Sequence, residues 1–179
     1  MNYVAFLRGI NVGGKNMIKM ERLREIVADL GFKNVRTYVN SGNVLFETKT
    51  ASDKTLAKKI HDAIHTSFSM DISVMVRTIE EIESIIAENP YAGQFDNDKD
   101  VHVFFLGEPL SNDHRELLLA NNSDVEFVTV TGRTIYYMLR ISILDSSLGK
   151  GFIEKKLKIP TTARNWRTIN KIAAMSIAS

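Results

Sequence analysis

Apolar residues alternate with polar ones in several short stretches of the chain, and this period of two is typical of β-strands. The predicted strands cover residues 3–8, 34–39, 43–48, 72–77, 101–107, 125–131 and 133–141. Between them, apolar residues recur at the spacing of an amphipathic helix, so that one face of each helix is apolar. The predicted helices cover residues 20–30, 53–68, 79–88 and 112–121. Gly31 is well suited to end the first helix, and Thr131-Gly132 predicts a tight hairpin turn.

The order of these elements predicts an internal duplication. Residues 3–77 give the order β-α-β-β-α-β, and residues 101–158 repeat β-α-β-β-α. This is the split β-α-β, or ferredoxin-like, unit. We therefore expect an α+β protein with two ferredoxin-like halves, antiparallel sheets and a C-terminal helix. The predicted boundaries are an N-terminal subdomain at 1–88, a linker at 89–100 and a second subdomain with the final helix at 101–179.

The second copy lacks a predicted last strand. After Pro160 the sequence predicts a helix instead, with Thr161 or Thr162 capping its free N–H groups. In this interpretation Arg164 and Arg167 lie on the helix as a cationic stripe. A helix N-terminus carrying cations attracts anions, but an ordinary capped amphipathic helix explains the same pattern.

Composition limits the class of protein. The chain has 179 residues, 44% of them hydrophobic, which is enough for a sizeable core. It has no cysteine, which excludes disulfides and thiolate metal sites and favours a reducing, cytoplasmic location. The sequence shows neither a signal peptide pattern nor an apolar stretch long enough to span a bilayer, so we expect no membrane association.

Charge is unevenly distributed along the chain. Residues 1–46 carry 7 basic and 3 acidic side chains, residues 47–149 carry 9 and 17, and residues 150–179 carry 7 and 1. If the two basic ends meet in space, they form a positive surface that attracts phosphates or carboxylates. The alternative is that both ends are ordinary solvated faces.

The most informative motif is a glycine-rich loop that follows the first predicted strand. Arg8 and Lys15 bracket Gly9, Gly13 and Gly14 with positive charge. Such a loop can bring backbone N–H groups close to an anion, although a strand-to-helix connection that needs positive φ explains the glycines equally well. The pattern is one residue short of a Walker P-loop, because Asn16 replaces the serine or threonine whose hydroxyl binds magnesium.

A second polar loop, residues 40–43, connects two predicted strands. Gly42 and its asparagine neighbours suit a hairpin turn, while Ser41 and Asn43 offer polar groups to a ligand. Strand order alone does not place this hairpin beside the glycine-rich loop.

Five runs of the sequence resemble the bacterial domain-of-unknown-function 1697 (DUF1697) family across essentially the whole chain. They are FLRGINVGG at 6–14, LGF at 30–32, VRTY at 35–38, SGNV at 41–44 and TARNWRT at 162–168. The resemblance implies a small cytoplasmic α/β protein with ferredoxin-like halves, and it groups the glycine-rich loop, the hairpin and the terminal segment as one set. It implies no activity. Asn40 stands where the family more often has glutamine, which leaves the polar role of the hairpin open.

Catalytic groups are sparse. His61 and His65 have a spacing that can bind a metal, but no third ligand is evident, and we expect no metal site. His102 alternates within a predicted strand, where a structural histidine is the common case. Neither a nucleophile elbow nor a histidine–acid relay is present. The sequence therefore assigns neither a reaction nor a cofactor; cations and backbone amides are the groups that could stabilise developing negative charge.

The leading hypothesis is a protein that binds a small molecule bearing a phosphate or carboxylate. The candidate ligand-binding residues are Arg8, Asn11, Gly13, Gly14, Lys15, Ser41, Asn43, Arg164 and Arg167. The alternative is a nucleic-acid-binding module with the topology of RNA-recognition domains, in which Phe6 and Phe46 stack on bases. A purely structural or partner-binding protein is the third hypothesis. The sequence assigns no oligomeric state.

Overall fold

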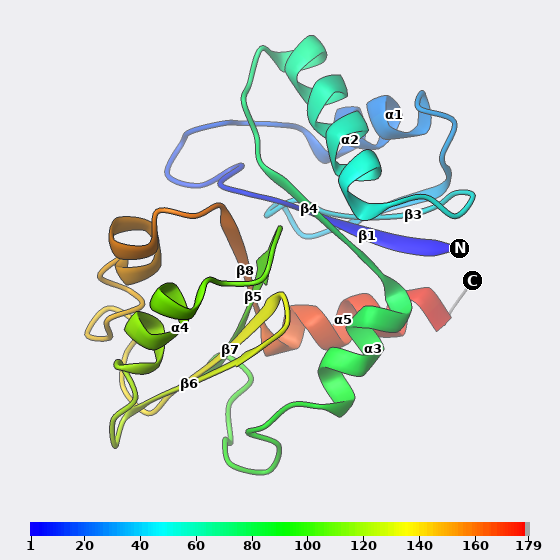
Figure 1. Ribbon diagram of the computed structural model, residues 1–179. Coiled ribbons are helices and arrows are strands. Elements are labelled where there is room, and N and C mark those ends of the chain that lie inside the picture. The colour runs from blue at the N-terminus through cyan, green and yellow to red at the C-terminus, as the bar shows by residue number, and fades with distance from the viewer. Residues whose placement is uncertain (178–179) are drawn as a thin grey trace. The chain divides into compact units, whose positions relative to one another are not determined.

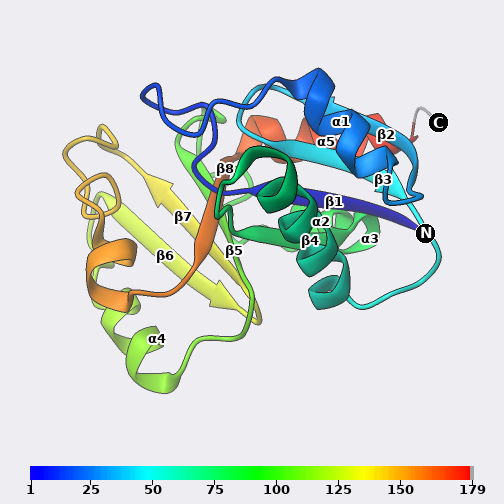
Figure 2. The same cartoon turned by 90° about the horizontal axis from the view of Figure 1, so that it is seen from above.

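A computed structural model describes residues 1–177, and it contains two antiparallel sheets with helices between their strands (Figures 1 and 2). The elements of the first half are β1 (Asn2–Leu7), α1 (Met20–Ala28), β2 (Lys33–Tyr38), β3 (Asn43–Glu47), α2 (Asp53–Phe68), β4 (Val74–Thr78) and α3 (Ile79–Ala87). Those of the second half are β5 (Val101–Leu106), α4 (Asn112–Leu119), β6 (Glu126–Thr131), β7 (Thr134–Leu139), η1 (Ile153–Leu157), β8 (Thr161–Asn165) and α5 (Trp166–Ile177). The α+β class and the strands and helices expected up to residue 141 are confirmed.

The first sheet has the strand order β2-β3-β1-β4, which is the antiparallel order of a ferredoxin-like unit. Helices α1 and α2 cover one face, where Leu23 and Ile60 pack with Tyr3, Ala5 and other strand residues in one apolar core. The opposite face is buried as well, because β1 is fully covered after its first residue. Burial on both faces explains why β1 has an almost continuous apolar sequence.

The second sheet has the equivalent order β6-β7-β5-β8. Its core is formed by strand residues such as Phe104 and Ile135 together with Leu118 of α4 and Leu157 of η1. The hairpin between β6 and β7 closes with Thr131 opposite Thr134, which confirms the tight turn expected at Gly132.

The expectation that the second copy lacks its last strand was wrong. Residues 161–165 form β8, which pairs with β5 along its whole length, and the final helix begins only at Trp166. The threonines and the short polar run suggested a capped helix start. Pairing with β5 overrides this local preference, since strand formation depends on the neighbouring strand more than on intrinsic propensity.

The two halves therefore repeat the same order, β-α-β-β-α-β followed at once by a helix, with the π-helical turn η1 in the place of α2. Equivalent positions in the two halves form equivalent backbone hydrogen bonds. Leu7 N–H donates to the Gly42 carbonyl at 2.8 Å, and Leu106 N–H donates to the Arg133 carbonyl at 3.0 Å. Both contacts join the end of the first strand to the hairpin of the same half, as expected for a duplicated unit.

A buried arginine occupies the fourth position of the last strand in each half. Arg77 lies opposite Val4, and Arg164 lies opposite Val103. Each guanidinium donates to the carbonyl of the preceding residue, at 2.8 Å in the first half and 2.7 Å in the second. These shared contacts support the duplication independently of strand order.

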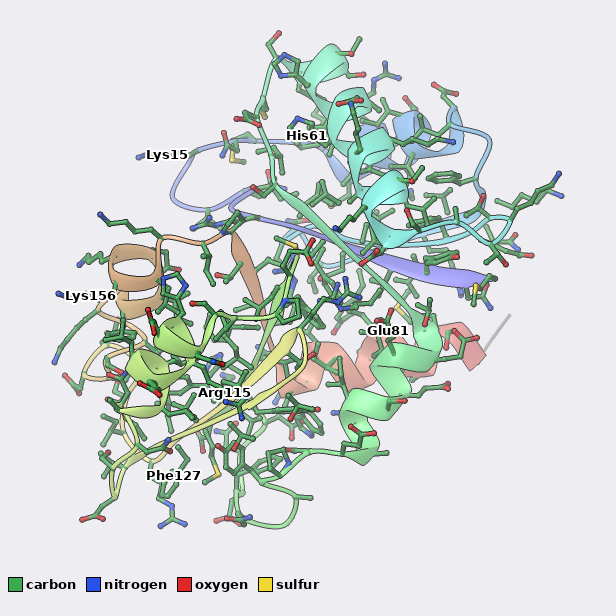
Figure 3. All side chains as sticks on the ribbon, in the orientation of Figure 1. Lys15, His61, Glu81, Arg115, Phe127 and Lys156 are labelled. Carbon is green, nitrogen blue, oxygen red and sulfur yellow. The ribbon has the colours of Figure 1, made fainter. Side chains whose placement is uncertain are left out.

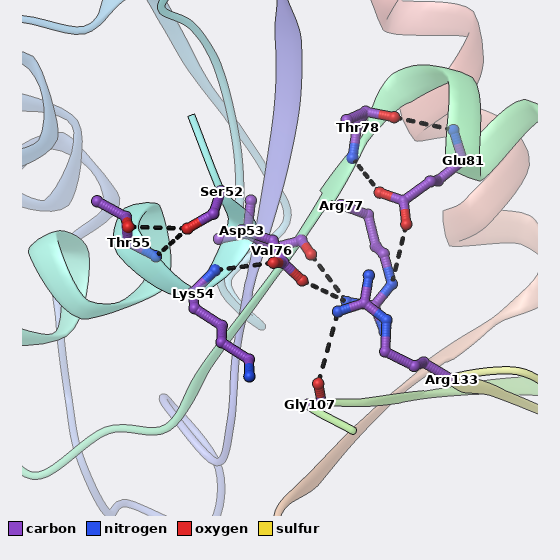
Figure 4. A network of polar contacts seen from close by, with 10 residues as sticks. All are labelled: Ser52, Asp53, Lys54, Thr55, Val76, Arg77, Thr78, Glu81, Gly107 and Arg133. Atoms are coloured by element: carbon purple, nitrogen blue, oxygen red, sulfur yellow. Dashed lines mark hydrogen bonds and ion pairs between the residues drawn. The ribbon is translucent and has the colours of Figure 1, made fainter. Parts of the chain in front are cut away.

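Each last strand runs directly into a helix through a side-chain cap. In the first half, Thr78 and Glu81 exchange hydrogen bonds in a capping box, and Arg77 lies 4.0 Å from carboxylate oxygens of both Asp53 and Glu81 (Figure 4). In the second half, Asn165 Oδ1 accepts a hydrogen bond from Thr168 N–H.

The chain divides into two compact units, residues 1–84 with 172–179 and residues 85–171. The division falls within α3 and α5, whereas the sequence predicts subdomains at 1–88 and 101–179 with a linker at 89–100; those boundaries stay a prediction. Across residues 1–177, no helix combines the length and apolar character needed to cross a membrane.

Candidate functional site

The glycine-rich connection between β1 and α1 is a small hairpin that projects from the first unit (Figure 2). Asn11 N–H donates to the Asn16 carbonyl at 3.1 Å, and Lys15 N–H donates to the Val12 carbonyl at 3.0 Å. Gly13 and Gly14, at φ 58° and 73°, occupy the central positions of this turn. Two successive positive φ values are what a type I′ turn requires, so the turn itself accounts for both glycines.

Asn11 fastens this loop to the rest of the unit. Its side-chain oxygen accepts from Ile18 N–H at 2.8 Å, and its Nδ2 donates to the carbonyls of Ile18 at 3.0 Å and Asn40 at 2.8 Å. These bonds close the loop at its base and connect it to the β2–β3 hairpin. This side chain, a predicted ligand-binding group, therefore has a structural role.

The β2–β3 hairpin, residues 39–42, lies at the same end of the sheet as the loop. The reason is the antiparallel pairing of β1 with β3, which places Phe6 opposite Asn43. Asn43 is completely buried, and its Nδ2 donates to the Tyr38 carbonyl at 2.8 Å and to Ser41 Oγ at 3.2 Å. The structure thus brings the two predicted loops together, which strand order alone had left open.

We call the exposed parts of residues 8–19 and 39–42 the loop–hairpin surface. A concavity of about 610 Å³ lies at this surface and extends to the first residues of α1; it is lined by Asn11, Met17, Ile18, Lys19, Met20, Glu21 and Asn40. Arg8 is partly exposed, and Lys15 is exposed and points outward from the loop (Figure 3). Residues 8–20 contain cations but no acidic side chain, and the first acidic residue after the loop is Glu21. The electrostatic potential along the loop is therefore positive.

The two C-terminal candidates are in different environments. Arg164 is a buried residue of β8 and donates to Thr162 Oγ1 at 2.9 Å, and burial lowers the pKa of its guanidinium to about 10. Arg167 is exposed in the first turn of α5. The expected cationic stripe on one helix is therefore wrong, because only Arg167 is helical. Both arginines belong to the unit of residues 85–171, and their use together with the loop stays a prediction.

The aromatic residues proposed to stack on RNA bases are both buried. Phe6 is 0% exposed and Phe46 is 2% exposed. Phe46 also stacks against Phe32, with ring centroids 4.6 Å apart, inside the core under α1 and α2. Neither side chain is available as a platform for nucleic-acid bases.

His61 and His102 have partners within the fold. His61 Nδ1 lies 2.9 Å from the Ile72 carbonyl, and its Nε2 lies 3.7 Å from Asp71. Burial lowers the pKa of His102, although the Asp100 charge and a hydrogen bond with the Lys99 backbone oppose the shift. Within residues 1–177 there is no group of three or more His, Cys, Asp or Glu side chains that could hold a metal ion.

The second half contains a polar cluster that the sequence does not predict. Glu126 accepts hydrogen bonds from Tyr137 OH at 2.6 Å, from Ser147 N–H at 2.8 Å and from the Ser147 hydroxyl. Burial alone would raise the pKa of Glu126, but these hydrogen bonds and the Lys150 charge outweigh it and hold the pKa below its usual value. Burial and the Glu126 carboxylate raise the pKa of Tyr137. The cluster fixes the segment after β7, and a lone glutamate at the start of a strand was its only sequence signal.

Comparison with known proteins gives a family and a structural relative. The family model described as "Protein of unknown function (DUF1697)" matches residues 1–136. The solved structure of conserved bacterial protein SP0830 from Streptococcus pneumoniae is similar, with a TM-score of 0.78, 26% sequence identity and coverage of 97% of each chain. The comparison with curated proteins produced no match. The family match spans more than half of the 179 residues, and this chain therefore belongs to the DUF1697 family.

Proposed function

We propose that the chain binds a small molecule bearing a phosphate or carboxylate at the loop–hairpin surface. The observation that carries the proposal is the concavity between the two loops, which adjoins a stretch of chain with cations and no acidic residue from Arg8 to Met20. The charged residues of its lining are Lys19 and Glu21, so the excess of positive charge comes from Arg8 and Lys15 of the adjoining loop. Arg8 can donate two parallel hydrogen bonds to such a group, while Lys15 and Lys19 act as point charges. The proposal is one of binding, and it includes no reaction.

The duplication supports this location. The two halves share a scaffold, yet residues 8–19 of the first half correspond to the shorter connection 107–111 of the second. The hairpin at 39–42 likewise corresponds to the shorter turn at 132–133. Both extensions lie at one end of the same sheet. Loops added to a rigid scaffold are where binding groups usually lie.

Arg164 and Arg167 belong to the proposal as additional charge partners. Arg167 is the one to test, because it is exposed and its replacement leaves the buried contacts of Arg164 intact. The proposed setting is cytoplasmic, in keeping with a chain that has no cysteine.

An amide-resolved NMR titration tests the proposal. Inorganic phosphate and acetate, added at constant ionic strength, should shift the amide signals of residues 8–19 and 39–43 before others. The double substitution Arg8→Gln/Lys15→Gln should weaken binding about tenfold or more, since each charged hydrogen bond contributes about 1.5–3 kcal/mol. Lys49→Gln is the matched control, because Lys49 is an exposed cation beyond the other end of β3.

Two results would count against the proposal. Equal affinity of the double variant and Lys49→Gln would show that the loop cations do not hold the anion. If short RNA bound with a steep loss of affinity at higher salt while phosphate and acetate gave no shifts, nucleic-acid binding would replace it. Arg167→Gln then tells whether the second unit takes part.

A further inference from the structure

We infer that the ligand of the loop–hairpin surface is an amphiphilic anion, whose apolar body contacts Val39 and Met17 while its charged group meets the loop cations. This inference rests on the proposed function and adds the ligand class. It comes from features that anion binding alone does not explain: a strained, exposed valine in the hairpin, and an exposed methionine in the lining of the concavity that the next hairpin residue, Asn40, also lines.

Val39 has a backbone conformation that its side chain disfavours. Its φ is 51°, in the left-handed region. The other non-glycine residues with positive φ in the described chain are Asn11, Asn16, Asn34, Ser69 and Lys158, none of which is β-branched. A β-branched residue in this region is an outlier, because its side chain crowds the backbone there.

The strain at Val39 is not offset by burial of its side chain, because Val39 is 48% exposed. Asparagine or glycine would form the same turn at lower free energy and with less apolar surface in water. The corresponding hairpin of the second half follows that rule, since Gly132 takes φ 54° there. A contact that forms only when a ligand is present would explain a valine at such a position.

Val39 adjoins a surface of matching character. Asn40, the next residue, lines the same concavity as Met17, which is 61% exposed. Met20 lines it too and is partly exposed. Methionine side chains are flexible and polarizable, which suits them to contact apolar groups of varied shape. Lys19 and Glu21 belong to the same lining, so the apolar surface adjoins one charge of each sign, and Arg8 and Lys15 of the neighbouring loop make the surroundings net positive.

The combination of exposed apolar side chains and nearby cations limits the class of ligand that fits this surface. A bare phosphate or a sugar phosphate would leave the valine and the methionines in water. An uncharged apolar molecule would make no use of Arg8, Lys15 and Lys19. A molecule with an aromatic or aliphatic body and one phosphate or carboxylate group satisfies both parts of the surface.

A series of phosphate monoesters with one headgroup tests the inference. Methyl, hexyl and phenyl phosphate, with inorganic phosphate as reference, are titrated into the full chain and followed by amide NMR. Hexyl or phenyl phosphate should bind at least about tenfold more tightly than methyl phosphate, because only they bury substantial apolar area. Comparison of the hexyl and phenyl arms distinguishes an aliphatic from an aromatic body.

Two substitutions of Val39 separate its strain from its contact. Val39→Asn should raise the melting temperature, because asparagine tolerates positive φ, and should reduce the preference for the larger esters severalfold. Val39→Thr keeps the branched shape and the strain, so it should lower that preference with little change in melting temperature. Neither variant should change the affinity for inorganic phosphate.

The results distinguish a failure of the amphiphilic ligand from a failure of anion binding. If all four anions bind equally at the loop–hairpin surface, or if Val39→Asn binds hexyl and phenyl phosphate as tightly as the original chain, the amphiphilic ligand is wrong while anion binding stands. If none of the four shifts the amides of residues 8–19 and 39–43, both proposals fail.

Discussion

Gly42 is the position at which a single methyl group should most disturb the loop–hairpin surface. A Cβ added there would lie 2.7 Å from Leu7 Cβ and 2.7 Å from Ile10 Cδ1. Leu7 cannot retreat easily, because its N–H donates to the Gly42 carbonyl at 2.8 Å and it is 0% exposed. Gly42 also has a φ of +82°, which side chains rarely adopt.

Gly31 provides a control with nearly the same backbone. Its φ is +84°, and an added Cβ would meet no atom within 4 Å. Alanine at either position should cost about 1–2 kcal/mol for the left-handed backbone. Gly42→Ala should cost a further ~1–3 kcal/mol for overpacking against Leu7 and Ile10. The expected totals are about 1–2 kcal/mol for Gly31→Ala and about 2–5 kcal/mol for Gly42→Ala.

Urea denaturation followed by far-UV circular dichroism measures both free energies of unfolding. The difference between the two variants isolates the steric contribution, because both glycines lie in the unit that contains residues 1–84. Gly42→Ala should also shift the amide signals of Leu7 and Ile10, which Gly31→Ala should leave in place. Equal destabilisation by the two substitutions would refute the close packing of the hairpin against the end of β1.

Asn11→Gly keeps the positive φ but removes the tether of the loop, so amide hydrogen exchange at Ile18 should accelerate; unchanged exchange would contradict the tether. Glu126→Gln should make the free energy of unfolding fall less steeply as the pH is lowered. The folded pKa of Glu126 lies below its ordinary value of 4.5, so its contribution is present above that pH and is lost as the pH falls through the folded value. Asn122 pairs through its side chain with both backbone groups of Val128 on the free edge of β6, and Asn122→Ala should increase aggregation measured by light scattering.

Most of the fold followed from periodicity, and the reason is visible in the first half. Helices such as α1 bury only one face, so their apolar spacing in the sequence marks them clearly. The exception is β8, whose residues 161–165 carry a polar pattern that resembles a helix cap. Its identity as a strand depends on pairing with β5, a contact between distant parts of the sequence.

The candidate site was only partly predictable. Loop residues 8–16 were found because glycine and cations mark an exposed connection, although Gly13 and Gly14 are explained by their turn. The structural roles of Asn11 and Asn43 were not predictable from the sequence. Their side chains donate hydrogen bonds to backbone carbonyls of Ile18, Asn40 and Tyr38, whose positions depend on the tertiary structure. The positive φ of Val39 is not predictable from the sequence, since a valine next to a strand carries no sign of it.

The amino-acid sequence by itself determined the element types up to residue 141, the evidence for a duplicated order and the family resemblance, because hydrophobic spacing and short motifs are local properties of the chain. Tertiary structure decided which of those elements meet. It placed the glycine-rich loop beside the β2–β3 hairpin, completed the second sheet with β8 and buried Arg164 within it. The physical reason is that strand pairing and burial are interactions between residues far apart along the chain, and their free energy outweighs the local preference of any one segment.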